Sequence, residues 1–541
     1  MRSTDAGSGT RRGQRRRSGG SGSVALAAVL VLLSFPRVAR GADEPGPSGR
    51  TLEIVEYRLE GVEHLTQLQV EAVLAPFLGP DRRLEDVEGT RVALEKAYAE
   101  RGYQGVTVAI PAQTVRGGVV VLKVTEAKVG RLRVNGARWF SPAEIRREAP
   151  SLAEGTVPNL DALMRDVATL NQLEDRRVTP ALRAGARPGT VDADLNVDDR
   201  LPLHASLELN NRQSSGTSAL RLNGQLRDDN LWQRGHSLTF SFQTAPQHVA
   251  EAKVFSLTYL ARFLRTPGVT LSLNGVVQNS DVSTLGVGAV RGRGRTAGTR
   301  LSFTLPGPPE LYHGLTAGFD YKYYGKEQQS DPLGRPIRYA TMLAQYTAAL
   351  SGKSSQTLLT ASAVASLRGA GSSEDTFDAK RVGATASFFH AALDASRTED
   401  LHGGIQLAAR FQGYLSPDPL IPSEQFSAGG ADTVRGYLEA QASGDRVALG
   451  SLEVRSPSIA GWVGKWMKEW RFHLFAEGGW VGVNGALTEQ TPEFYLWSAG
   501  GGMQLKIGPA SGALDVGLPL RTLGTTRRYH PRIQFRLTTE F

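Results

Sequence analysis

Arg435 and Glu477 are the residues of this chain whose types and settings most strongly suggest a specific interaction. Arg435 lies between Val434 and Gly436-Tyr437, in a gap of roughly 30 residues between two strand-like segments, and a loop that long among tight strands usually has a function. Its guanidinium is a planar, permanently charged fork that binds carboxylates, and the glycine permits a sharp bend. The pattern predicts that Arg435 pairs with an acidic side chain.

Residues 470–479 alternate as a β-strand does, with the even-numbered side chains apolar. In a membrane barrel this apolar face contacts lipid and Glu477 points into the lumen, where a loop folded inward over 418–446 would bring Arg435 to it. Exchanging the two charges is then expected to recover some activity. Glu453 and Arg455, on one face of another strand, are interpreted as a solvated channel wall. The alternative reading of the Arg-Gly-Tyr turn is an ordinary hairpin loop.

The positive charge of the chain comes from its N-terminus. The formal net charge is +9, but residues 1–41 hold eight arginines and one aspartate, which leaves 54 basic against 52 acidic residues, or about +2. That balance gives no reason to expect a nucleic-acid partner. Five arginines in 11–17, an apolar run over 24–35 and small residues near Gly41 predict a signal peptide over 1–41, followed by a linker over 42–51. A short uncleaved anchor is the alternative.

Two copies of a small α+β module are predicted, over 52–126 and 127–200. The first runs strand, helix, helix, strand, strand. Residues 52–59 alternate as one strand, Thr66 and Gln69 form a capping box, and Gly102 ends a helix that begins near Leu84. The second segment repeats the order. Two unrelated ferredoxin-like modules are the alternative.

From residue 201 to 541 the chain changes to segments of about ten residues with dyad alternation, separated by turn residues. About sixteen segments are distinguishable, among them 254–263, 384–393 and 532–541. No stretch beyond the N-terminus approaches the roughly 20 apolar residues of a membrane helix, so a membrane span here must be a β-barrel. A soluble sandwich or propeller is the alternative.

Several of these residues resemble motifs of one known family, the two-partner-secretion (TpsB) transporters, which include the ShlB, FhaC and HecB haemolysin secretion/activation proteins. Residues 98–103, 108–113 and 118–124 resemble the family's first POTRA domain. Val434, Arg435, Gly436 and Tyr437 resemble its inward-folded sixth extracellular loop. The barrel-wall motif that binds the loop arginine is resembled by Phe475, Glu477 and Gly479, although the family usually has aspartate where Glu477 stands. Phe541 resembles the terminal aromatic signal of outer-membrane barrels.

The resemblance implies α+β POTRA repeats followed by an all-β transmembrane barrel of about 16 antiparallel strands. It places the barrel among the lipids of the bacterial outer membrane and the POTRA domains in the periplasm, with a barrel assembly machinery acting during biogenesis. It further implies that the POTRA domains capture a large, β-helical partner exoprotein in its unfolded state, and that the barrel secretes it without nucleotide. Many relatives carry an N-terminal plug helix, which is expected to be absent here because about ten residues separate the predicted cleavage site from the first strand.

Two other functions stay open, an assembly insertase of the same superfamily and a passive diffusion porin. An enzyme is not expected. The chain has no cysteine, which excludes thiol catalysis and Cys-ligated zinc, and it contains neither a His-Glu-x-x-His nor a Gly-x-Ser-x-Gly pattern. No cofactor and no metal site are predicted.

Overall fold

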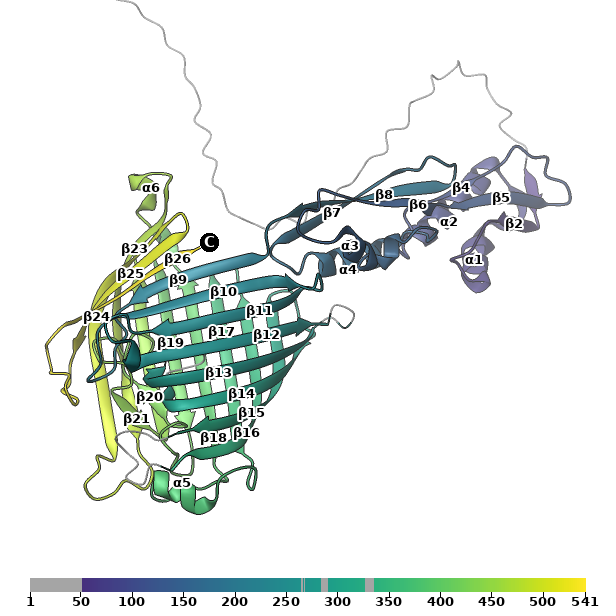
Figure 1. Ribbon diagram of the computed structural model, residues 1–541. Helices are drawn as coiled ribbons and strands as arrows, with labels where there is room; N and C mark the ends of the chain where they lie inside the picture. The colour runs from purple at the N-terminus through teal and green to yellow at the C-terminus, as the bar shows by residue number, and fades with distance from the viewer. Residues whose placement is uncertain (1–50, 264–265, 267, 284–289, 326–334) are drawn as a thin grey trace, which may run out of the picture.

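The computed structural model describes residues 51–263, 266, 268–283, 290–325 and 335–541. Two small α+β modules extend one after the other from one end of a β-barrel (Figure 1). The predicted signal peptide, the linker and the expectation about a plug helix fall on residues outside the described ranges. Among the described residues, no helix combines the length and apolar character needed to cross a bilayer.

The first module is a three-stranded sheet covered by two helices. Its elements are β1 (Leu52–Ile54), β2 (Glu56–Glu60), α1 (Gln67–Leu74), η1 (Ala75–Phe77), β3 (Gly79–Arg82), α2 (Leu84–Ala99), β4 (Val106–Ala109) and β5 (Val119–Glu126). Strands are ordered β2-β5-β4, with β2 parallel to β5. The capping box of Thr66 and Gln69 is confirmed, and Gly102 has the expected positive φ of 86°.

One prediction about the first module is wrong. Residues 52–59 form two strands, not one, because β1 leaves the main sheet and pairs with β3. The backbone amides of Val55 and Glu56 both hydrogen-bond to the carbonyl of Gly118, where the chain changes partners. Alternation alone does not reveal this change, since the side chains alternate in both pieces.

The second module repeats the order of the first. It comprises β6 (Lys128–Asn135), α3 (Pro142–Arg147), η2 (Pro150–Leu152), α4 (Leu160–Leu170), β7 (Arg176–Ala184) and β8 (Thr190–Asp199). The sheet order is β6-β8-β7, again with the outer strand β6 parallel to the middle one. Each module buries its own apolar cluster, as expected of two separate folding units.

The second module is fixed to the barrel by polar contacts. The side-chain amide of Gln233, in a barrel turn, donates to the carbonyl of Trp139 (3.0 Å) and accepts from the amide of Ser141 (2.8 Å). Beside it, Asp175 of the module lies 2.7 Å from the ring nitrogen Nε2 of His204 at the start of the barrel.

The barrel is closed and has sixteen antiparallel strands, which confirms the prediction. They are β9 (Leu203–Asn210), β10 (Arg221–Leu231), β11 (His236–Thr244), β12 (Ala252–Arg262), β13 (Val269–Ser283), β14 (Val290–Leu305), β15 (Leu311–Tyr324), β16 (Ile337–Ser351), β17 (Ser355–Ser366), β18 (Phe389–Asp400), β19 (Gln406–Leu415), β22 (Arg446–Arg455), β23 (Met467–Gly482), β24 (Glu493–Ile507), β25 (Ala510–Pro519) and β26 (Arg532–Glu540). Closure leaves no exposed sheet edge, as a membrane span requires.

One predicted strand is misplaced. Residues 384–393 were expected to form a strand, but β18 begins only at Phe389, and helix α5 (Glu374–Lys380) precedes it. Ala384, Ala386 and Phe388 instead belong to a buried apolar cluster, together with residues of the segments that lie at the end opposite the modules. Every second residue over 384–388 is buried, so the sequence there alternates as that of a strand does although no strand is present.

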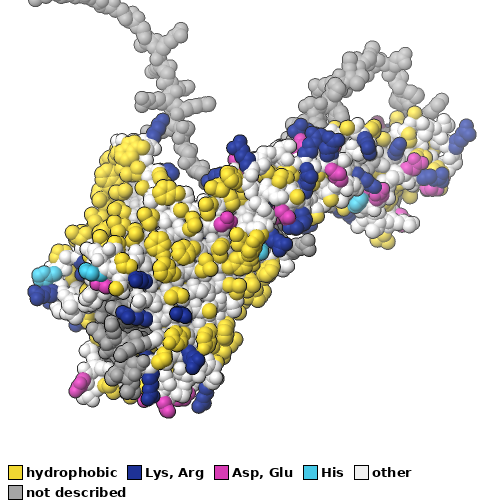
Figure 2. All heavy atoms as spheres, in the orientation of Figure 1, with side chains coloured by type: hydrophobic (Ala, Val, Ile, Leu, Met, Phe, Trp, Pro, Cys, Tyr) yellow, Lys and Arg dark blue, Asp and Glu magenta, His cyan; other side chains and the backbone are white. Residues whose placement is uncertain are grey.

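The outer wall of the barrel is apolar. Large hydrophobic side chains point outward along the strands, for example Leu474 and Leu537, which are 71% and 54% exposed. Figure 2 shows such side chains spread over the wall, whereas charged side chains gather on the modules and at the barrel ends. This is the distribution expected of a barrel surrounded by lipid.

Phe541 lies at the seam where the barrel closes. It exchanges backbone hydrogen bonds with Ala205 of β9 (2.8 and 3.2 Å), and the residue is 75% exposed. Strands β26 and β9 are paired from Arg536–Asn210 to Glu540–Ser206. The terminal residue thus adds to the closing ladder and presents an aromatic ring beyond it.

Candidate functional site

The chain between β19 and β22 folds into the barrel. This segment, residues 416–445 and here called the inner loop, contains a short hairpin of β20 (Phe426–Ala428) and β21 (Ala442–Gly444). Figure 1 shows the hairpin inside the barrel, enclosed by the strands of the wall. Val434 and Tyr437 at its tip are fully buried, so the loop is packed against the interior and is not a surface turn.

The structure brings Arg435 to Glu477 on the inner face of β23. The guanidinium Nε and Nη2 donate to Glu477 Oε1 at 2.8 and 2.6 Å, and the backbone amide of Arg435 donates to Oε2 at 2.7 Å. Both residues are more than nine-tenths buried. Hydrogen bonds between ionised groups are about twice as strong as neutral ones, so this pair is a firm attachment for the loop tip.

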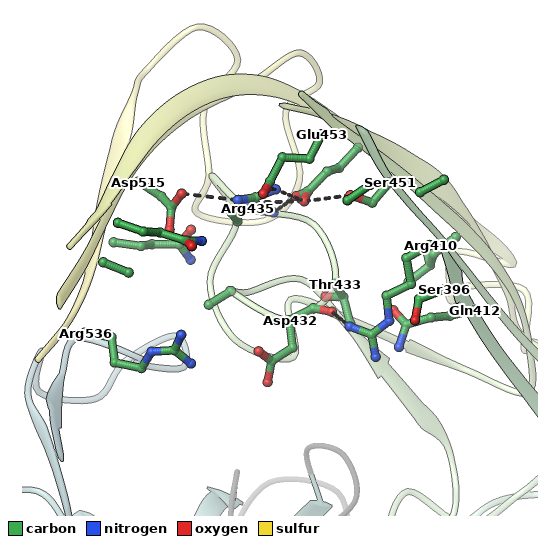
Figure 3. A pocket seen from close by; sticks show the side chains of 18 of the residues that line it. Ser396, Arg410, Gln412, Asp432, Thr433, Arg435, Ser451, Glu453, Asp515 and Arg536 are labelled. Atoms are coloured by element: carbon green, nitrogen blue, oxygen red, sulfur yellow. Dashed lines mark hydrogen bonds and ion pairs between the residues drawn. The ribbon is translucent and has the colours of Figure 1, made fainter. Parts of the chain in front are cut away.

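Two further carboxylates hold the same guanidinium, and Figure 3 shows both converging on it. Arg435 Nη2 donates to Glu453 Oε2 of β22 at 2.7 Å, and Nη1 donates to Asp515 Oδ1 of β25 at 3.1 Å. Glu453 lies on the inner wall beside the cavity, as expected, but it is buried against Arg435 and is not an openly solvated side chain. Sequence reasoning missed Asp515 entirely, because an acid on the inner face of a barrel strand is an ordinary feature.

The aromatic ring of Phe475 supports the arginine from one side. The guanidinium carbon of Arg435 lies 3.6 Å from the ring centroid, which is close enough for a cation–π contact. The ring lies over β24 at Gly500, where an added Cβ would come within 2.5 Å of it. Because residue 500 is glycine, there is room for the ring of Phe475 beneath the guanidinium.

The other two carboxylates around Arg435 have further partners of their own. Arg455 Nε donates to Glu453 Oε1 at 2.7 Å, and the ring nitrogen Nε2 of His473 lies 2.6 Å from Asp515 Oδ1. Apart from the bonds that Arg435 donates, Glu477 accepts only from the hydroxyl of Ser451, at 3.1 Å, and it has no second cation among the described ion pairs. Glu477 is thus the carboxylate that depends most on Arg435.

Gly436 and Tyr437, which follow Arg435, pack closely against the barrel wall. Gly436 has φ of 92°, and its backbone lies so close to Gly517 of β25 that a Cβ on residue 517 would be 2.5 Å from the Gly436 nitrogen. The hydroxyl of Tyr437 lies 3.0 and 3.1 Å from the carbonyls of Arg521 and Trp497. Only glycine at both 436 and 517 permits this approach without displacing the loop.

Gly479 performs a similar steric role within the wall. A Cβ at this position would lie 2.0 Å from the carbonyl oxygen of Ala448 on β22. The strands that carry Glu453 and Glu477 therefore pack closely beside the loop tip.

The base of the inner loop has two ionic attachments of its own, which sequence reasoning missed. Asp445 is fully buried and binds both guanidinium nitrogens of Arg381 at 2.6 and 2.7 Å. Glu424 accepts from Lys322 of β15 at 2.7 Å. These charges are far apart in sequence, and no spacing rule connects them.

A cavity of about 350 Å³ adjoins the loop tip. Figure 3 shows Arg410 and Arg536 projecting into it from the barrel wall, with Asp432 of the loop between them. Its lining mixes both signs of charge. Such a chamber suits water and passing polar groups better than a tightly bound apolar ligand.

Two groups of acids and histidines among the described residues lie close enough to hold an ion, Glu63-His64-Glu126 and Asp175-His204-Asp229. Both are already engaged with the protein. Glu126 accepts from the amides of Glu63 and His64 and from the hydroxyl of Tyr98 (2.6 Å). The second group attaches the module to the barrel and pairs with arginines. Neither arrangement points to a metal.

Comparison with known protein families gives matches in two parts of the chain. Residues 52–127 match the ShlB-type POTRA domain, and residues 338–505 match the haemolysin secretion/activation protein family ShlB/FhaC/HecB. The outer membrane transporter CdiB of Dickeya dadantii (strain 3937) is 24% identical over 439 residues, covering 74% of this chain and 71% of that protein. CdiB of Escherichia coli is 25% identical over 203 residues, 38% of this chain and 33% of that protein.

Solved structures share the fold. The structure of CdiB from Escherichia coli superposes with a TM-score of 0.60 at 19% identity and covers 93% of both chains. BamA from Haemophilus ducreyi lacking POTRA domains 1–3 superposes with a TM-score of 0.55 at 14% identity, covering 91% of this chain and 99% of that one. At these identities the likeness concerns architecture alone.

Proposed function

We propose that the chain is a two-partner-secretion outer-membrane transporter of the ShlB/FhaC/HecB family, which captures an unfolded partner exoprotein through residues 52–200 and secretes it through the barrel. The modules, both taken as POTRA domains, face the periplasm in this proposal. No nucleotide takes part, and folding of the partner outside the cell gives the transport its direction.

The observation that carries the proposal is the inner loop, attached inside the barrel by Arg435. A loop held by three carboxylates of the wall occupies the path that a polypeptide must take. Its attachments are ionic, and so they can be exchanged for contacts with water and with a passing chain. We assign Val434, Arg435, Gly436 and Tyr437 as the latch, with Phe475, Glu477 and Gly479 as its receiving wall.

The capture step uses a sheet edge. Strand β4 lies at one edge of the first module's sheet, and an extended segment of the partner would add to such an edge through backbone hydrogen bonds. The partner is expected to be large and β-helical. Assembly of the barrel itself would involve the outer-membrane assembly machinery, with Phe541 as its signal.

Co-expression with candidate secreted partners tests the proposal. The partner should appear in the medium with the intact chain and stay inside with a chain lacking residues 52–200, although both barrels insert. A passive porin predicts steady conductance that does not depend on 52–200. An assembly insertase predicts impaired insertion of other barrels on deletion of the chain, and an adjacent gene for a large secreted protein would count against it.

A further inference from the structure

The turn between β22 and β23, residues 456–466, is unlike the other turns at the module end of the barrel. It has 11 residues, whereas the other turns there have two to six. Turns on this side of an outer-membrane barrel are usually short. It also contains helix α6 (Ala460–Val463), which Figure 1 shows projecting beyond the barrel end.

This turn exposes two tryptophans. Trp462 is 89% exposed and Trp466 is 57% exposed. A tryptophan has one of the largest apolar surfaces among side chains, so two together in water would be unfavourable. The amphipathic indole is instead favoured where a membrane meets water.

The two rings are held in place by an ordered backbone. Pairing of the flanking strands continues as far as Ile459, whose amide donates to the carbonyl of Trp470 at 2.9 Å. Gly464 then lets Trp466 fold across the chain, because a Cβ at 464 would lie 2.9 Å from the indole nitrogen. The exposed rings therefore belong to a preformed surface.

The apolar surface of the turn continues that of the outer wall. On β23, Leu474 and Phe472 point outward (71% and 46% exposed), and the ring of Trp470 lies 5.9 Å from that of Phe472. Figure 2 shows apolar side chains running along the wall to the end where α6 lies. A surface that begins as lipid-facing wall and ends in tryptophans is suited to the edge of the bilayer.

Two lysines give the turn a positive charge, which attracts anionic lipid headgroups. Lys465 and Lys468 are exposed, and neither has an ion-pair partner among the described residues. Lysines beside exposed tryptophans are typical of segments that lie in a membrane interface and attract anionic lipids.

We propose that residues 456–466, with Lys468, form a lipid-binding anchor that inserts Trp462 and Trp466 among the phospholipid headgroups of the periplasmic leaflet. The anchor is part of the β22–β23 hairpin, which also carries Glu453 and Glu477. It therefore fixes, relative to the bilayer, the part of the wall that receives Arg435. The inference concerns lipid binding and does not depend on the secretion function.

Spin labelling tests the anchor directly, because the chain has no cysteine and any introduced one is unique. Gly461→Cys suits the label, since an added Cβ there meets nothing within 4 Å. Leu452→Cys on the outer wall and Glu100→Cys on the first module give the lipid and water references. The full chain is placed in vesicles of phosphatidylethanolamine and phosphatidylglycerol, and accessibility to oxygen is compared with accessibility to a neutral nickel chelate.

The label at 461 should show an oxygen-to-nickel ratio between the two references. The double variant Trp462→Ala/Trp466→Ala should move it to the water value, while Trp232→Ala, which removes an exposed tryptophan from another turn, should leave it unchanged. Heat modifiability of each variant verifies that the barrel is folded.

A water-like ratio at 461 in the unsubstituted turn overturns the proposal, and protection that appears only in whole cells would indicate a protein partner instead. Lys465→Gln/Lys468→Gln should reduce the depth in these vesicles and have no effect in vesicles of phosphatidylcholine. An equal effect in both vesicle types would refute the charge part of the anchor.

Discussion

Replacement of Arg435 by alanine should release the inner loop from the barrel wall. The substitution removes both guanidinium bonds to Glu477 and those to Glu453 and Asp515, and it deprives Phe475 of its cation. Glu453 keeps Arg455, but Glu477 keeps only a serine hydroxyl and the backbone amide of residue 435. Glu477 is therefore left buried without a cation.

The magnitude follows from the burial of the pair. Removing one partner of a buried charge pair typically costs about 3–5 kcal/mol. The lower end, about 3 kcal/mol, applies here because water in the adjacent cavity can solvate the orphaned carboxylate. Since about 1.36 kcal/mol corresponds to a factor of ten, the ratio of attached to released loop should fall roughly 150-fold.

Thiol labelling measures this ratio. Ala431→Cys places the protein's single cysteine near the loop tip, and a membrane-impermeant maleimide reacts with it when the loop is released. Arg435→Ala in this background should raise the labelling rate by about two powers of ten, up to the rate of a fully exposed thiol. Secretion of a partner should be lost while insertion of the barrel continues.

Arg536→Ala is the matched control, since Arg536 is an exposed arginine of the same cavity. Labelling of Arg435→Ala within twofold of this control, together with normal secretion, would refute the latch. The sequence alone led us to expect that exchanging the charges of Arg435 and Glu477 recovers some activity, but the structure leads us to expect the opposite. A glutamate at 435 would face Glu453 and Asp515, so the exchanged protein should stay inactive.

Three other perturbations test separate parts of the structure. Gly517→Ala should displace the loop tip, because the new Cβ would lie 2.5 Å from the nitrogen of Gly436, and it should raise labelling at 431 as Arg435→Ala does. Leu474→Lys puts a charge on the lipid-facing wall and should cost about 2–4 kcal/mol near mid-membrane, measured as a lower denaturant midpoint for unfolding in vesicles, whereas the same change at an exposed residue of the modules should cost little. Burial raises the pKa of the Glu126 carboxyl, but hydrogen bonds from Tyr98 and from backbone amides outweigh this and lower it overall. Its stabilisation is therefore present above the ordinary glutamate pKa and lost as pH falls through the lowered value, so hydrogen exchange in 52–126 should quicken on acidification more in the natural chain than in Glu126→Gln.

Much of the architecture could be predicted from local sequence patterns. The capping box at Thr66, the positive φ of Gly102 and the alternation of the barrel strands all depend on near neighbours in the chain, and the structure has a capping box, a positive φ and sixteen strands as predicted. Where alternation misled, at 52–59 and 384–393, the side chains alternate for another reason: a change of partner strand, or packing into the lumen.

In the candidate site, too, some contacts could be predicted from local sequence and others depend on the tertiary structure. An arginine in a long glycine-containing loop and an acid on the inner face of a barrel strand suggested that Arg435 meets Glu477, and the family resemblance favoured this pairing over an ordinary hairpin loop. Nothing local distinguishes Glu453 or Asp515 from other acids of the lumenal faces. Their selection depends on the register of β22 and β25 against β23 and on how deeply the loop enters.

The chain by itself therefore determined the two modules and the barrel, because periodicity and turn chemistry act over a few residues, and the charged pair at the loop tip followed from the family resemblance. The tertiary structure decided that three carboxylates share one arginine and that the loop base is held by Arg381 and Lys322. It also decided that two tryptophans stand exposed at the barrel rim. Each of these features depends on residues brought together only when sixteen strands close in one register.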